Sequence, residues 1–214
     1  MAGLKVCGIT RPDDLRTCDE LGVDAVGINL WTGSKRGLTV PQAQSLLAGS
    51  RGGQRVGVFV DFTPAQVAEA VATLHLDAIQ PHGDAPPQGF AALGLPWIWV
   101  VRGTPDLATL RVPMPAPAWV LLDAAVPGYG GAGKTTDWTW ACKAVEALAP
   151  LPVWLAGGIT PANAMTALLQ VRPAGLDVAS GAECSGATRG EKDPVRIEAL
   201  LQATRAPGAG PSTG

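Results

Sequence analysis

The feature that most constrains the fold is a series of eight short apolar segments, rich in Val, Ile, Leu and Trp, that recur along the chain. They are residues 4–7, 25–29, 56–60, 78–80, 97–101, 119–122, 153–156 and 176–179. Each segment is apolar nearly throughout rather than at alternate positions, which is typical of parallel strands covered by helices on both faces. The sequence therefore predicts an α/β protein built on a parallel sheet.

Helix signals stand between these segments. Thr63 precedes Pro64, and Val67, Val71 and Leu74 follow at helical spacing, so a helix is expected to begin after Thr63. Similar starts are expected at Thr39, Asp137 and Thr160.

Eight strands with seven or eight helices, in units of roughly 27 residues, fit a single (β/α)8 TIM barrel. A doubly wound open sheet has the same local pattern, but the count of eight favours the barrel. We expect the barrel to occupy residues 1–203 and to end with a helix over about 193–203. The helix signal over 105–110 is weak, and residues 204–214, rich in Gly, Pro, Ala and Ser, predict a disordered C-terminal tail.

Composition excludes several classes of function. Lys plus Arg number 16 against 18 Asp plus Glu, so no basic field is present to hold nucleic acid. No apolar run approaches the 18 or so residues that span a bilayer, and the first residues lack a signal-peptide pattern, so we expect a cytoplasmic protein with no membrane partner. The four cysteines show no Cys-x-x-Cys spacing, which predicts reduced thiols, and the two histidines have no third ligand nearby, so we expect no metal.

The active site of a (β/α)8 barrel is built at the carboxyl ends of its strands. Cys7 closes the first predicted strand, where a cysteine is either a small buried hydrophobe or, as a thiolate, a base or nucleophile. Asp123 directly follows an apolar strand, where a carboxylate is either a solvated loop start or a positioned acid. Arg36 is either a solvated loop charge or a guanidinium that binds a carboxylate. Further polar residues at strand ends are Gln80, His82 and Asp177.

Two glycine-containing turns follow the seventh and eighth predicted strands. They contain Gly157 and Gly158, and Ser180 and Gly181. Glycine lets backbone N–H groups approach an anion closely, and barrels often bind phosphate in these two loops. The turns therefore predict a phosphate site, with tight turns of no further role as the alternative.

Residues 128–135 match the Gly-x4-Gly-Lys-Thr pattern of a nucleotide-binding P-loop. In a true P-loop the strand leads directly into the glycines and the helix begins at the Lys-Thr pair. Here residues 123–127 intervene, and the better helix start is Asp137. We interpret the run as a glycine-rich loop over a substrate, with Lys134 free to contact it.

Taken in order, these segments resemble the phosphoribosylanthranilate isomerase family of tryptophan biosynthesis, from Lys5 to about Asp193. No single motif is specific, but the whole series is. The carriers are Lys5-Val-Cys-Gly-Ile-Thr10, Asp24-Ala-Val-Gly27, Ser34-Lys-Arg36, Val56-Gly-Val-Phe-Val60, Gln80-Pro-His-Gly83, Leu121-Leu-Asp123, Gly130-Gly-Ala-Gly133, Asp137-Trp138, Gly157-Gly-Ile-Thr-Pro161 with Asn163, and Asp177-Val-Ala-Ser-Gly181.

The resemblance implies an isomerase that converts N-(5-phospho-β-D-ribosyl)anthranilate to 1-(2-carboxyphenylamino)-1-deoxy-D-ribulose 5-phosphate, an Amadori rearrangement with no cofactor. By similarity, Asp123 is the general acid, Cys7 is the general base and Arg36 binds the anthranilate carboxylate. The family pattern also implies that Gln80, His82 and Asp177 line the pocket and that Gly157, Gly158, Ser180 and Gly181 bind the phosphate. Whether the chain is a monomer or a homodimer stays open.

Three other functions fit the sequence less well. A related phosphosugar isomerase barrel, such as the one of histidine biosynthesis or one of dual specificity, pairs two aspartates, whereas the first strand here ends in Cys7. A P-loop nucleotide-binding protein would require ATP binding through Lys134. A non-catalytic ligand-binding barrel has no need of both Cys7 and Asp123.

Overall fold

The computed structural model describes residues 1–50, 52–83, 87–124, 136–186 and 190–210. All eight predicted strands are present and pair in parallel in the order β4-β3-β2-β1-β8-β7-β6-β5. Their bounds are β1 Gly3–Cys7, β2 Ala25–Asn29, β3 Gln54–Val60, β4 Ala78–His82, β5 Ile98–Arg102, β6 Trp119–Asp123, β7 Val153–Leu155 and β8 Gly175–Val178.

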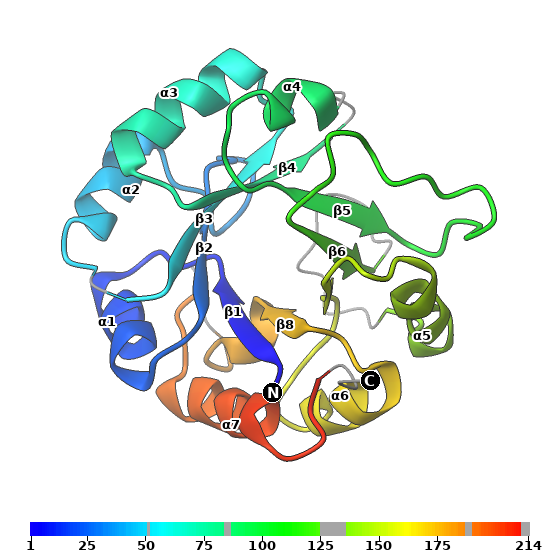
Figure 1. The fold of residues 1–214 in the computed structure, drawn as a ribbon. Coiled ribbons are helices and arrows are strands. Elements are labelled where there is room, and N and C mark those ends of the chain that lie inside the picture. The colour runs from blue at the N-terminus through cyan, green and yellow to red at the C-terminus, as the bar shows by residue number, and fades with distance from the viewer. Residues whose placement is uncertain (51, 84–86, 125–135, 187–189, 211–214) are drawn as a thin grey trace.

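The two ends of this strand order meet, which makes the sheet a nearly closed barrel. β4 and β5 are joined by a bridge between Ile79 and Trp97, and the Ile79 N–H donates to the Pro96 carbonyl at 3.0 Å. Figure 1 shows the strands at the centre and the helices around them. The predicted (β/α)8 barrel is confirmed.

The helices cover the outside of the barrel. Their bounds are α1 Pro12–Leu21, α2 Val40–Leu47, α3 Pro64–Leu74, α4 Pro87–Ala91, α5 Trp138–Ala147, α6 Ala164–Val171, the short 3-10 helix η1 Ser180–Ala182 and α7 Pro194–Arg205. Within the described ranges, none of these helices is long and apolar enough to cross a membrane.

Three of the four predicted helix starts are confirmed. Thr39 and Thr63 each form a capping box with a glutamine three residues on, and Asp137 accepts hydrogen bonds from the N–H groups of Thr139 and Trp140. The predicted start at Thr160 is wrong. The Asn163 side chain binds the Thr160 N–H at 2.8 Å and the Gly158 carbonyl at 2.9 Å, so a turn forms first and α6 begins at Ala164.

The weak helix expected over 105–110 does not form. Asp106 instead closes a turn, accepting the Ala108 N–H at 2.9 Å, so β5 and β6 are joined without a helix. At the other end of the chain, α7 continues to Arg205 and Ala209 is buried, where the sequence suggested a disordered tail. The Thr204 carbonyl accepts the Ala2 N–H at 3.1 Å, which ties this segment to the start of β1.

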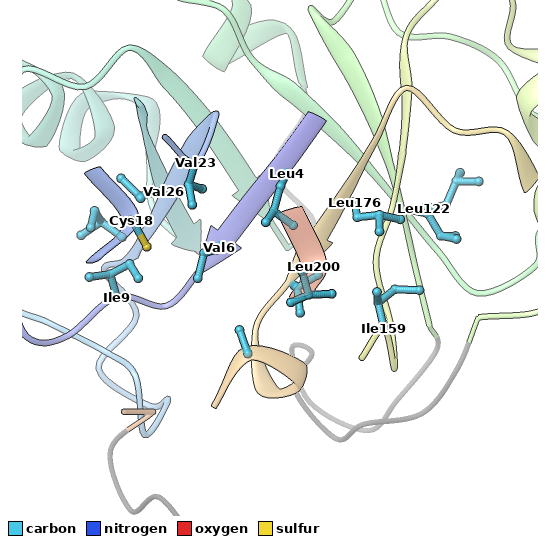
Figure 2. Close-up of a cluster of buried hydrophobic side chains, with 14 of the residues drawn as sticks. Leu4, Val6, Ile9, Cys18, Val23, Val26, Leu122, Ile159, Leu176 and Leu200 are labelled. Carbon is cyan, nitrogen blue, oxygen red and sulfur yellow. The ribbon is translucent and has the colours of Figure 1, made fainter. Parts of the chain in front are cut away.

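The core has two layers, and together they fix which strand residues face inward. The larger cluster lies between the strands and the helices and includes Leu4, Val6, Leu122 and Leu176 (Figure 2). A smaller cluster, which includes Leu121, fills the inside of the barrel. Because side chains alternate along a strand, the neighbours of the outward residues point into the barrel.

Candidate active site

The inward positions at the carboxyl ends of the strands carry polar side chains. Cys7 ends β1, Gln80 and His82 end β4, Asp123 ends β6, and Asp177 lies in β8. Each is next to an outward apolar residue, so the alternation brings these five predicted residues to one end of the barrel interior. Their positions fit the prediction.

A lysine that the sequence analysis did not select lies at the centre of this group. Lys5, two residues before Cys7, is 1% exposed, and its Nζ donates to Asp177 Oδ2 at 2.8 Å and to Gln80 Oε1 at 2.8 Å. Burial acts to lower the pKa of Lys5, but the charge of Asp177, together with that of Cys7 once its thiol is ionised, outweighs burial and raises the pKa. Lys5 is therefore a buried ammonium that links β1, β4 and β8.

This lysine also orients Gln80 and His82. Since Lys5 holds the amide oxygen of Gln80, the amide Nε2 faces His82 Nε2, 2.9 Å away, and donates to it. Burial, with the charges of Lys5 and Arg102, lowers the pKa of His82 to about 4. His82 is therefore neutral at pH 7, with its proton on Nδ1.

Cys7 rests as a thiol. Burial raises its pKa and Asp177 adds to that effect, while the positive charges of Lys5, Lys192 and Arg36 oppose it. Gly27 on β2 makes room for the sulfur, because a Cβ there would lie 2.7 Å from Cys7 Sγ. Three cations around one thiol favour the thiolate whenever its proton is removed.

Asp123 has the properties of an acid near neutral pH. Burial and the charge of Asp177 raise its pKa to about 6, although the Ala124 N–H, which donates to Oδ1 at 2.9 Å, and the charge of Arg102 work against the rise. β8 and β7 separate Asp123 on β6 from Cys7 on β1 in the strand order. The two groups can therefore reach different atoms of one ligand.

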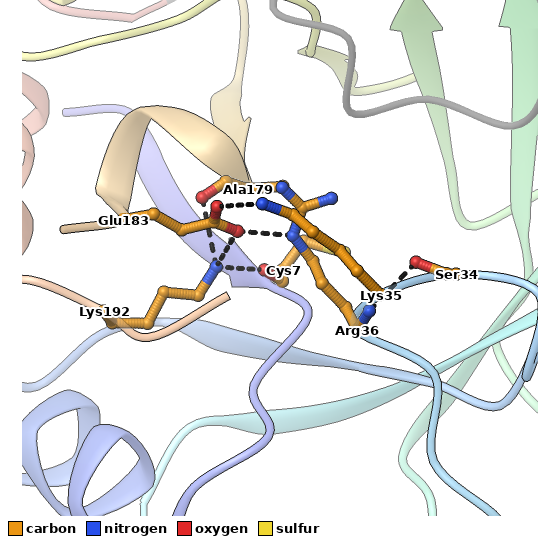
Figure 3. Close-up of polar contacts among 7 residues, drawn as sticks. All are labelled: Cys7, Ser34, Lys35, Arg36, Ala179, Glu183 and Lys192. Carbon is orange, nitrogen blue, oxygen red and sulfur yellow. Dashed lines mark hydrogen bonds and ion pairs between the residues drawn. The ribbon is translucent and has the colours of Figure 1, made fainter. Parts of the chain in front are cut away.

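Arg36 is buried rather than solvated. It lies in the loop after β2, is 7% exposed, and its Nε donates to the carboxylate of Glu183 (Figure 3). Its Nη2 is buried and has no hydrogen-bond partner among the described residues. A guanidinium that is held through Nε and keeps Nη2 unused is suited to binding a carboxylate.

The two glycine turns lie against each other after β7 and β8. Gly157 and Gly158 have φ of +85° and +65°, which only glycine adopts without strain. Gly181 approaches the turn so closely that a Cβ there would lie 1.8 Å from the Ile159 carbonyl oxygen. Ser180 belongs to η1 beside them, so the four predicted phosphate residues come from adjacent loops.

Four charged residues of the site were not predicted from the sequence: Lys5, Arg102, Glu183 and Lys192. Lys5 could have been found, because it stands within an apolar strand. A lysine at such a position is expected to be buried, and lysine is almost never fully buried unless it is paired with an opposite charge. Glu183 and Lys192 lie outside the strands, where nothing in a single sequence distinguishes them from surface charges. Within the described ranges, no group of three or more His, Cys, Asp or Glu side chains is placed to hold a metal ion, and the P-loop-like run at 128–135 lies outside those ranges.

The fold and the site together define a class: a (β/α)8 barrel with a buried thiol and a carboxyl group at the carboxyl end of its strands. The family of N-(5'phosphoribosyl)anthranilate (PRA) isomerase matches residues 4–203. The chain belongs to this family and is an isomerase.

Relatives and solved structures agree. N-(5'-phosphoribosyl)anthranilate isomerase of Myxococcus xanthus is 40% identical over 94% of this chain and 95% of that protein. The same enzyme of Thiobacillus denitrificans is 39% identical over 95% of this chain and 98% of that protein. The crystal structure of phosphoribosyl anthranilate isomerase from Thermotoga maritima superposes with a TM-score of 0.81 at 29% identity, covering 96% of this chain and 99% of that one.

A further solved structure holds a ligand. It is phosphoribosyl anthranilate isomerase in complex with reduced 1-(o-carboxyphenylamino)-1-deoxyribulose 5-phosphate, with a TM-score of 0.79 at 27% identity, covering 96% of this chain and 99% of that one.

Proposed function

We propose that this chain converts N-(5-phospho-β-D-ribosyl)anthranilate to 1-(2-carboxyphenylamino)-1-deoxy-D-ribulose 5-phosphate, with Asp123 as general acid and Cys7 as general base. The observation that carries the assignment is the placement of a carboxyl group with a pKa of about 6 and a thiol at one end of the barrel, on β6 and β1. The family and the ligand of its solved member support the substrate.

In the first step Asp123 donates its proton to the furanose ring oxygen. The bond between that oxygen and C1 breaks, and the nitrogen lone pair forms a protonated Schiff base with C1. A carboxyl group whose pKa lies near neutrality keeps a usable protonated fraction and still transfers the proton readily.

In the second step the Cys7 thiolate removes the proton from C2 of the sugar. The electron pair of the C2–H bond moves toward C1 and neutralises the iminium nitrogen, giving an enolamine that tautomerises to the ketone. The cations Lys5, Lys192 and Arg36 surround the thiol and stabilise the thiolate that does this work.

Arg36 and the glycine turns hold the two anionic ends of the substrate. Arg36 has a buried, unused Nη2 for the anthranilate carboxylate, and the turns at Gly157–Gly158 and Ser180–Gly181 offer backbone N–H groups to the phosphate. Gln80, His82 and Asp177, fixed by Lys5, line the space between.

A fluorescence assay tests the proposal. Phosphoribosylanthranilate is generated in situ from anthranilate and phosphoribosyl pyrophosphate, and its loss is followed with and without the protein. Cys7→Ala and Asp123→Asn are each expected to lower kcat by at least about 100-fold, because each removes a proton transfer, and to retain binding of the reduced product analogue.

Cys142→Ala is the matched control. Cys142 lies on α5 and donates to the Gln170 carbonyl at 3.1 Å, away from the barrel interior, so its activity should equal that of the parent protein. A folded parent protein that does not accelerate the fluorescence loss would refute the substrate, and equal losses in the two cysteine variants would refute the base.

A further inference from the structure

Next to the thiol lies a cluster of four charged side chains, of which three are buried and Lys35 is exposed, and two of its members, Glu183 and Lys35, have no part in the steps above. It consists of Lys35, Arg36, Glu183 and Lys192, and Figure 3 shows Glu183 between Lys192 on one side and Lys35 and Arg36 on the other. Glu183 is 6% exposed and Lys192 is 3% exposed. A carboxylate this deeply buried requires compensating partners.

Both oxygens of Glu183 are engaged by cations. Oε1 accepts from Arg36 Nε and lies 3.5 Å from Lys192 Nζ, and Oε2 lies 3.0 Å from Lys35 Nζ. Burial acts to raise the pKa of Glu183, but the hydrogen bond from Arg36 and the charges of Lys192 and Lys35 outweigh it and lower the pKa. Glu183 is therefore ionised at neutral pH.

The cluster is anchored to the strand ends that carry the chemistry. Lys192 Nζ donates to the carbonyls of Cys7 at 2.8 Å and of Ala179 at 3.0 Å, which end β1 and follow β8. An antiparallel bridge joins the backbones of Glu183 and Lys192, so the carboxylate has a fixed place relative to Cys7.

The charges of the cluster do not balance. Three cations contact one carboxylate, which leaves a formal surplus of two positive charges among these four side chains. Asp14 lies near enough to Lys192 for their charges to interact, but within the described ranges neither a hydrogen bond nor an ion pair joins Asp14 to Arg36. The surplus lies beside the unused Nη2 of Arg36, where an anion would complete the cluster.

We propose that Glu183 is a positioning residue that holds Arg36 by its Nε, so that the remaining guanidinium edge receives the carboxylate of the substrate. The proposal rests on the proposed role of Arg36 in binding that carboxylate. Glu183 itself does not touch the substrate, and it acts only through the orientation of Arg36 relative to Cys7.

The test compares two ligands on four proteins: the parent, Glu183→Gln, Arg36→Met and the double variant. The ligands are the reduced product analogue and its counterpart that carries phenyl in place of carboxyphenyl. Glu183→Gln should weaken binding of the carboxylated ligand by about 10- to 100-fold and leave the phenyl ligand unchanged, because it removes a charge-assisted hydrogen bond behind Arg36. In the Arg36→Met background the same substitution should add less than about threefold, because the residue through which it acts is gone.

Two further variants keep the test decisive if Glu183→Gln folds poorly. Glu183→Asp keeps the charge but shortens the side chain, and it should show a smaller loss restricted to the carboxylated ligand. Glu69→Gln, on the exposed face of α3, is the matched control and should bind both ligands as the parent does.

Equal losses for both ligands would overturn the proposal, since a merely structural role would not discriminate between them. An additive loss in the double variant would also overturn it. If Arg36→Met binds the two ligands with the parent's preference, the proposed role of Arg36 fails as well, and that result is distinct from a failure of Glu183 alone.

Discussion

The ion pair of Lys5 and Asp177 gives the sharpest prediction on stability. Lys5→Met keeps nearly the length of the side chain but removes its charge. Asp177 then remains buried without the cation 2.8 Å from its Oδ2, and Gln80 Oε1 loses its donor. Removing one member of a buried ion pair typically costs about 3–5 kcal/mol, because the other charge is left uncompensated.

This loss is large for a protein of this size. Domains are stable by only about 5–15 kcal/mol, and 214 residues at about 2.1 cal/mol/K each give an unfolding entropy near 0.45 kcal/mol/K. Lys5→Met should therefore lower Tm by roughly 7–11 °C.

The double variant Lys5→Met/Asp177→Leu separates the ion pair from simple packing. With both charges removed, the main remaining deficit is the unbonded Gln80 Oε1, about 1–3 kcal/mol, so the double variant should be more stable than Lys5→Met. The free energies of unfolding come from urea titrations followed by circular dichroism. Lys143→Met, at an exposed position of α5, is the control and should stay within about 0.5 kcal/mol of the parent.

The sign of the pH dependence is also fixed. The pKa of Lys5 is raised in the folded protein, so its stabilisation is fully present below the unfolded pKa of lysine and is lost as pH rises through the folded value. The difference between parent and Lys5→Met should thus persist from neutral pH to about pH 10 and shrink above it. A Lys5→Met variant within about 1 kcal/mol of the parent at pH 7, or a double variant less stable than the single one, would refute this reasoning.

Three further predictions concern the acid, the thiol and a helix cap. Catalysis needs Asp123 protonated and Cys7 ionised, and the pKa of Asp123 is about 6 whereas that of Cys7 is raised. A plot of kcat/KM against pH should therefore rise to pH 6, stay level, and fall only above the pKa of Cys7. A maximum confined to pH 6 or below would contradict this order of the two pKa values. Because the pKa of Cys7 is raised, iodoacetamide should modify Cys7 slowly at pH 7.5 and faster above pH 9. Peptide mass spectrometry measures the extent of labelling. Rapid labelling at pH 7.5 would show that the thiol is already ionised at that pH. Asp137→Ala should lower the free energy of unfolding by about 0.5–2 kcal/mol in a urea titration, because two N–H groups of α5 lose their acceptor. The value of kcat should not change. An unchanged free energy of unfolding would mean that water replaces the cap.

The strands were predictable because their signal is local. Eight apolar runs and their spacing give the barrel, and the barrel places Cys7, Gln80, Asp123 and Asp177 at one end of its interior. Most helix starts follow from caps, as Thr63 shows. The start at Thr160 fails because Asn163 offers a competing side-chain acceptor, which a propensity argument does not weigh.

The ion pairs of the site were not predictable, because they are contacts between residues that are distant in the sequence. Lys5 and Asp177 are 172 positions apart, and Arg36 and Glu183 are 147 apart. A single sequence shows each of these side chains as a charge, but only the closed barrel shows which ones lose water and which partners they meet. The burial of Arg36 and the raised pKa of Asp123 follow from the same closure.

The barrel closes between β4 and β5, and few contacts of the sheet hold these two strands together. β1 and β8 share a ladder of four residue pairs, whereas among the described residues one isolated bridge, between Ile79 of β4 and Trp97 just before β5, joins the two ends of the sheet. We therefore expect the wall of the pocket at this junction, which holds His82 and Arg102, to open at a lower cost in free energy than the wall where β1 pairs with β8. We expect the pocket to change its width first between β4 and β5, without moving Cys7 relative to Asp177.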